Sequence, residues 1–98
     1  MIQHVVMFRW KEGVDDAHVA AASAALATLP GLIPQIVSFR YGADLRTVPN
    51  NFDFAVSAQF ASLEDYLIYR DHPDHQALVQ TYMVPFIVER AAVQFAEG

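Results

Sequence analysis

A tyrosine and a histidine in the second half of the chain, Tyr69 and His75, are residue types that can carry out acid–base chemistry as a pair. A neutral imidazole with a pKa near ~6.5 can take a proton from an activated methylene, and a phenol can hydrogen-bond to the enolate oxygen that develops. On an unbroken helix this spacing would place the two side chains about 240° apart around the axis. Pro73 lies between them and disfavours helical geometry at His72, so a helix break there can turn both toward one cavity.

The same residues also fit structural roles. His75 can hold the helix break together by bonding a backbone carbonyl while Tyr69 packs as an aromatic side chain, and the sequence leaves both readings open. His4 lies in an apolar segment, where a histidine fits a hydrogen-bonded core or pocket position. It also fits a place in the same cavity as Val6 and Phe8. We carry both readings of each histidine forward.

A metal site is not favoured by the histidine spacing. His72 and His75 stand three residues apart, with Asp71 and Asp74 beside them, which resembles part of a metal-binding set. No third ligand follows at a recognisable spacing. Proton transfer by an imidazole and a phenol needs no metal, so we expect no metal and no other cofactor.

The composition predicts one small domain with more apolar side chain than its own core needs. The chain has 98 residues, enough for a single domain over residues 1–98. Hydrophobic residues make up 54% of the chain and charged residues 17%, against roughly 45–50% and 25% in average globular domains. We therefore expect a homodimer, in which a second copy covers the excess apolar surface.

Charge and the amino-terminal segment argue against several partners. The net charge is −5 and the six basic residues are scattered, so no basic patch is available for nucleic acid. The first apolar run is broken by Arg9 and Lys11 and has no basic start, which argues against a signal peptide or membrane span. The lack of cysteine fits a reducing compartment. We expect a cytoplasmic protein without nucleic-acid or membrane partners.

Hydrophobic periodicity predicts four strands and two helices. Phe52, Phe54 and the alternate residues to Phe60 form one apolar face, the period-two pattern of a strand. Ser62 resembles the cap of a helix that breaks at Pro73. Strands are expected over residues 2–10, 36–41, 52–60 and 90–95, and helices from Asp15 or Asp16 to Leu29, where Pro30 stops the helix, and from Leu63 toward Pro85.

This order, β-α-β-β-α-β, predicts an α+β fold of the ferredoxin-like type. Such a fold has an antiparallel sheet with its helices on one face. The other face needs cover, and a second sheet packed against it across a two-fold axis would supply it. The expected assembly is therefore a dimeric α/β barrel.

Three segments together resemble the Dabb (stress-responsive A/B barrel) family over essentially the whole chain. The most specific is the His-Pro-x-His element after the second helix. The segments are HVVMFRWK over residues 4–11 with GV at 13–14, LPGLIP over residues 29–34 and YRDHPDH over residues 69–75. The resemblance implies a ferredoxin-like protomer, a homodimer whose sheets form a barrel-like core, and a pocket in each protomer between helices and sheet.

Family resemblance also implies candidate site residues. One plant relative, a polyketide (olivetolic acid) cyclase, closes a linear poly-β-ketone by a cofactor-free aldol reaction. The tyrosine and the histidine that carry out the reaction in this cyclase correspond to Tyr69 and His75. A further histidine of the cyclase corresponds to His4. Phe54 replaces a histidine of the cyclase, and Phe86 loosely matches a pocket tryptophan. The expected substrate-binding residues are His4, Val6, Phe8, Phe54, Leu78 and Phe86.

Several functions remain open at this stage. The leading hypothesis is a protein that binds a small, partly apolar carbonyl or phenolic compound and acts as a cyclase or isomerase, with His75 as base and Tyr69 as oxyanion partner. The alternatives are a non-enzymatic stress-responsive dimer and a cofactor-free monooxygenase, the latter by analogy of fold alone.

Some plant relatives hold a cation on main-chain carbonyls in the segment that corresponds to residues 29–37. Such a site leaves no signature in the side chains.

Overall fold

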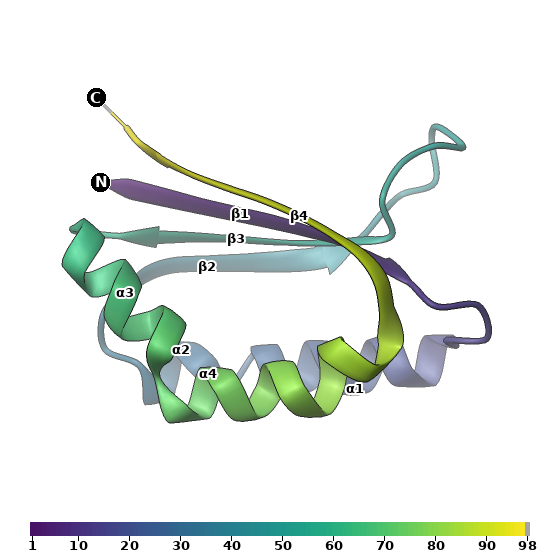
Figure 1. The fold of residues 1–98 in the computed structure, drawn as a ribbon, viewed down its shortest axis with the longest axis horizontal. Helices are drawn as coiled ribbons and strands as arrows, with labels where there is room; N and C mark the ends of the chain where they lie inside the picture. The colour runs from purple at the N-terminus through teal and green to yellow at the C-terminus, as the bar shows by residue number, and fades with distance from the viewer. Residues whose placement is uncertain (98) are drawn as a thin grey trace.

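The computed structural model describes residues 1–97 and shows a four-stranded antiparallel sheet with all of its helices on one face (Figure 1). The sheet order β2-β3-β1-β4 places the first and third strands in the centre. This is the ferredoxin-like arrangement, and the fold prediction is confirmed. The strands are β1 (Ile2–Trp10), β2 (Ile36–Ala43), β3 (Phe54–Phe60) and β4 (Ile87–Ala96).

The two faces of the sheet differ because side chains alternate along each strand. On the inner face, toward the helices, His4 pairs with Ala58, and Phe8 pairs with Phe54. The inner-face residues of β3 are all buried. The outer face is the side of the sheet that points away from the helices, and we define it by five residues of β1 and β4. Part of this face is exposed apolar surface. The outer face comprises Val5, Met7, Ala91, Val93 and Phe95.

The first helical region is two helices rather than the single one expected. Helix α1 (Asp16–Leu26) is capped by Asp15, whose carboxylate accepts from the His18 backbone N–H. A short helix, α2 (Leu29–Leu32), follows at once. The prediction that Pro30 stops the helix was wrong, because proline needs no N–H partner and suits a first helical turn, the position it takes in α2.

The second helical region breaks where the sequence predicts it. Helix α3 (Leu63–Asp71) starts at Ser62, whose hydroxyl accepts from the Asp65 N–H at 3.1 Å. His72 adopts extended geometry, and α4 (Pro73–Leu78) begins at the proline. Beyond α4 the chain continues as a π-helical turn over Val79–Met83 and a 3₁₀ turn over Val84–Phe86. The expected run toward Pro85 is thus helical, with a wider turn in its middle.

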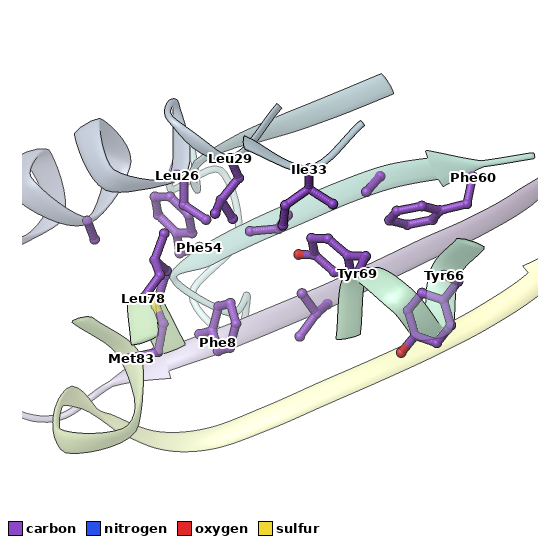
Figure 2. Packing of buried hydrophobic residues seen from close by; sticks show 14 residues of the cluster. Phe8, Leu26, Leu29, Ile33, Phe54, Phe60, Tyr66, Tyr69, Leu78 and Met83 are labelled. Atoms are coloured by element: carbon purple, nitrogen blue, oxygen red, sulfur yellow. The ribbon is translucent and has the colours of Figure 1, made fainter. Parts of the chain in front are cut away.

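The core lies between the inner face of the sheet and the helices. Figure 2 shows Leu26, Leu29 and Ile33 packed over β3, whose Phe54 and Phe60 rings face them. Phe52, by contrast, lies before β3, and its ring packs beneath the Arg9 guanidinium at 4.1 Å. No helix within residues 1–97 is long and apolar enough to cross a membrane.

Candidate functional site

A cavity of about 300 Å³ opens between the inner face of the sheet and the helices. Its walls are largely apolar, and a few polar side chains interrupt them, as in many small-molecule sites. Residues of β1, α3, α4 and β4 all contribute to the lining. The polar residues of the lining are His4, Tyr66, Tyr69, Arg70, His75, Gln76 and Arg90, and the apolar ones include Val6, Phe8, Leu26, Leu78 and Met83.

Tyr69 and His75 meet in this cavity. Their ring centroids are 4.2 Å apart, and the His4 ring lies 6.0 Å from that of Tyr69. Tyr69 stands near the end of α3, whereas His75 stands in the first half of α4. The bend at His72 therefore brings together two side chains that a straight helix would point in different directions.

The hydrogen bond of His75 defines which ring nitrogen is free. His75 Nδ1 lies 3.0 Å from the Arg70 carbonyl oxygen, and a carbonyl can only accept, so Nδ1 carries the proton. In the neutral ring, Nε2 then keeps its lone pair. Burial lowers the pKa of His75, and the nearby Arg90 charge adds to this, while the bond to Arg70 opposes it. The neutral, basic form therefore dominates at neutral pH.

His4 presents the opposite tautomer. Its side chain is 4% exposed, and Gln94 Nε2 lies 2.9 Å from His4 Nδ1. Because an amide nitrogen can only donate, Nδ1 is the acceptor and Nε2 carries the proton. Burial lowers the pKa of His4 to about 4. His4 is therefore a neutral hydrogen-bond donor at neutral pH.

Tyr69 keeps its phenol proton. The side chain is 3% exposed, and burial raises the pKa of the hydroxyl well above its ordinary value. This hydroxyl makes no hydrogen bond within residues 1–97. Among the described residues, no fully enclosed side-chain oxygen or nitrogen lacks a partner. The Tyr69 hydroxyl is therefore not fully enclosed, and Tyr69 is one of the residues that line the cavity.

The other expected binding residues divide into two groups. Val6, Phe8 and Leu78 line the cavity beside His4. Phe54 and Phe86 do not, which differs from the expectation. Phe54 is 2% exposed, with its ring 5.7 Å from that of Trp10.

Phe86 is held away from the cavity by a histidine that the sequence reasoning gave no role. Its ring stacks on that of His18 at 3.8 Å between centroids. The imidazole Nε2 of His18 is in turn 2.9 Å from the Tyr82 carbonyl oxygen. His18 thus ties the amino-terminal part of α1 to the chain just before β4.

Sequence reasoning missed four polar residues of the lining: Tyr66, Arg70, Gln76 and Arg90. Tyr66 precedes Tyr69 by three residues, so helical spacing was the signal that would have placed both on one face. Arg90 and Gln94 lie on the same face of β4. That this face points toward the cavity follows from the pairing of Arg90 with Phe8, which the sequence alone does not show.

His72 and His75, the two histidines around Pro73, are not part of a metal-binding cluster within the described residues. Within residues 1–97 no group of three or more potential ligands is placed to hold a metal ion. His72 instead caps α4, because its Nδ1 accepts from the Asp74 N–H at 3.1 Å. In the segment of the suggested main-chain cation site, the carbonyls of Leu29 and Ile33 already accept backbone hydrogen bonds. That site stays a prediction.

Comparison with known proteins identifies relatives of the whole fold. The profile of the Dabb family, the stress responsive A/B barrel domain, matches residues 2–97. An uncharacterised protein of Streptomyces coelicolor is 30% identical over 79 residues, 79% of this chain and 81% of that one.

Solved structures agree with this match. A dimeric ferredoxin-like protein of unknown function from Thermobifida fusca has a TM-score of 0.91 and 38% identity, covering 98% of this chain and 90% of its own. Hydroxynitrile lyase from Passiflora edulis has a TM-score of 0.83 at 18% identity, covering 96% and 90%; this second likeness concerns the fold alone. The chain belongs to the Dabb family of stress responsive A/B barrel domains.

Proposed function

We propose that the cavity binds a small, partly apolar carbonyl or phenolic compound and that Tyr69 and His75 catalyse a cofactor-independent proton transfer of the cyclase or isomerase type. The observation that carries this proposal is that the ring of His75, whose Nε2 is unprotonated, lies 4.2 Å from the ring of Tyr69 between centroids in one largely apolar cavity. A base and a hydrogen-bond donor that share a water-poor site are what enolate formation requires.

The proposed step uses each group in the state described above. His75 Nε2 takes a proton from the carbon next to a carbonyl. The electron pair of that C–H bond forms a carbon–carbon double bond, and the π electrons of the carbonyl move onto its oxygen. The Tyr69 hydroxyl donates a hydrogen bond to the resulting enolate oxygen, and the neutral His4 Nε2–H supplies a second donor. In a cyclisation, the enolate carbon attacks a second carbonyl of the same molecule, and the alkoxide that forms takes the proton back from His75. In the isomerisation of an unsaturated ketone, the dienolate takes that proton back at another carbon.

We also propose that the protein acts as a homodimer through the outer face of the sheet. The side chains of Met7, Val93 and Phe95 there are 38%, 54% and 48% exposed. Exposed apolar side chains this close together favour burial against a partner. The T. fusca relative is described as dimeric, which supports the same assembly here.

A ligand screen tests the proposal. The purified protein is heated with a panel of linear poly-β-ketones, phenols and aromatic acids, and the melting temperature is compared with that of the His75→Ala and Tyr69→Phe variants. We expect compounds that stabilise the wild type and lose that effect in the variants. The matched control is Tyr82→Phe, which removes a phenol hydroxyl outside the cavity lining.

The bond between His75 and the Arg70 carbonyl makes a second variant necessary, because His75→Ala removes both a base and a structural contact. His75→Asn keeps an N–H donor in the place of Nδ1 and removes Nε2. Under the proposal this variant folds normally and does not turn over a stabilising compound. If His75→Asn turns over such a compound at the wild-type rate, His75 has only the structural role.

A further inference from the structure

The cavity lining is positively charged although the whole chain carries a net charge of −5. Two arginines, Arg70 and Arg90, line it, and no Asp or Glu of the described residues 1–97 does. Arg70 is neutralised by its neighbour Asp71, with two hydrogen bonds of 2.9 and 3.1 Å. Arg90 makes no ion pair or side-chain hydrogen bond within the described part of the chain. One arginine of the lining is therefore left without a counter-charge.

The position of Arg90 on β4 directs it to the same cavity as the candidate reacting groups. It pairs with Phe8 across the sheet, and it shares the inner face with Gln94, which holds His4. The adjacent Glu89 points to the other face and pairs with Arg9 at 2.8 Å. Arg90 lowers the pKa of both His4 and His75, which supports a position close to both rings.

The rim and the depth of the cavity differ in polarity. Arg90 is exposed, whereas Phe8, Leu78 and Met83 of the same lining are 7%, 7% and 2% exposed. A ligand with one charged end and an apolar body fits such a site, since its charge stays at the wet rim and its body leaves water. A guanidinium offers two parallel N–H donors, which match the two oxygens of a carboxylate.

We infer that the natural ligand of this cavity carries a carboxylate, held by Arg90 at the rim, with its apolar body directed toward Phe8 and Met83. The inference rests on the proposed function for the place of the reacting groups. It narrows the substrate class from carbonyl or phenolic compounds in general to those that also carry a carboxylate, such as keto acids with an aryl or alkyl body. Arg90 is then a specificity residue for the acid group, separate from the proton transfer at His75.

The test compares one acid with its neutral counterpart. Titrations of ¹⁵N-labelled protein with 4-phenylbutanoate and 4-phenylbutanamide, followed by NMR, give both dissociation constants and the residues that respond. We expect the acid to bind at least about tenfold more tightly than the amide, with shifts at cavity residues. Arg90→Gln should abolish this preference and leave amide binding unchanged, while Arg90→Lys should keep part of it. Lys11→Gln is the control for net charge, because Lys11 does not line this cavity.

Three results would overturn the inference: equal affinity of the wild type for acid and amide, an unchanged preference in Arg90→Gln, or no binding of the acid at the cavity. Failure of the proposed function has a different signature. In that case His75→Asn leaves any turnover unchanged, while the preference for the acid still depends on Arg90.

Discussion

Acidification is expected to destabilise the fold through His4, the one histidine of the described residues 1–97 whose side chain is almost completely buried. Its imidazole accepts a hydrogen bond from Gln94 through Nδ1, a bond that the neutral ring alone can make. Burial lowers the pKa of His4 from 6.5 to about 4 in the folded protein. In the unfolded chain the ring has its ordinary pKa, so protons favour unfolding over the interval between the two values.

The direction and the size of the pH effect on stability follow from the pKa of His4 in the folded protein and in the unfolded chain. Above pH 6.5 the ring is neutral in both states, and His4 adds no pH dependence. As the pH falls from 6.5 toward 4, the unfolded chain binds a proton that the folded protein does not, so the free energy of unfolding decreases. The full loss is roughly 3 kcal/mol, and most of it is reached by pH 4.5. Below pH 4 the loss levels off.

Urea unfolding at pH 7.5, 6.5, 5.5 and 4.5, at one protein concentration, measures this loss. The variant His4→Asn is the reference, since its Oδ1 can accept from Gln94 in place of Nδ1 and never takes up a charge in this range. His75 and the carboxylates titrate in both proteins and cancel in the difference. We expect the wild type to lose roughly 2–3 kcal/mol more than His4→Asn between pH 7.5 and 4.5. Parallel curves for the two proteins would refute the assignment of His4 as a buried neutral ring.

Three further predictions concern the fold and the assembly. Ser62→Ala removes the cap of α3 and should lower the free energy of unfolding by about 1 kcal/mol in urea; an unchanged midpoint would show that the hydroxyl stabilises nothing. Leu29→Ala should cost about 2–5 kcal/mol in the same assay, because Leu29 is 1% exposed, and a loss below 1 kcal/mol would contradict its place in the core. Val93→Asp should convert the proposed dimer into a folded monomer in sedimentation velocity, whereas a dimer as tight as the wild type would place the interface elsewhere.

Much of the fold could be predicted because it depends on local patterns. The first strand, Ile2–Trp10, has the predicted bounds, since a segment rich in β-branched and aromatic residues ends there at Lys11 and Glu12. The end of α1 could not be predicted in the same way. Pro30 fits both the stop of one helix and the first turn of the next, and the sequence does not distinguish the two.

The candidate site was predictable only where the signal was local. Pro73 marks the break that lets Tyr69 and His75 meet, and all three lie within one short segment. Arg90 gave no such signal, because a strand residue faces the cavity only in one register, and that register comes from pairing with β1. Phe86 was expected in the cavity lining but lies outside it. The reason is related, since its stacking partner His18 lies far away in the sequence.

Proton transfer itself is the most direct test of the central claim. The exchange of the α-protons of 4-phenyl-2-butanone with D₂O, followed by proton NMR, reports enolate formation without knowledge of the natural substrate. We expect the wild type to accelerate exchange, His75→Asn to slow the accelerated rate by about 100-fold or more, and Tyr69→Phe to slow it at least about tenfold, with Tyr82→Phe unchanged. Exchange at the buffer rate with the wild type, or at the wild-type rate with His75→Asn, would contradict the role of His75 as a base.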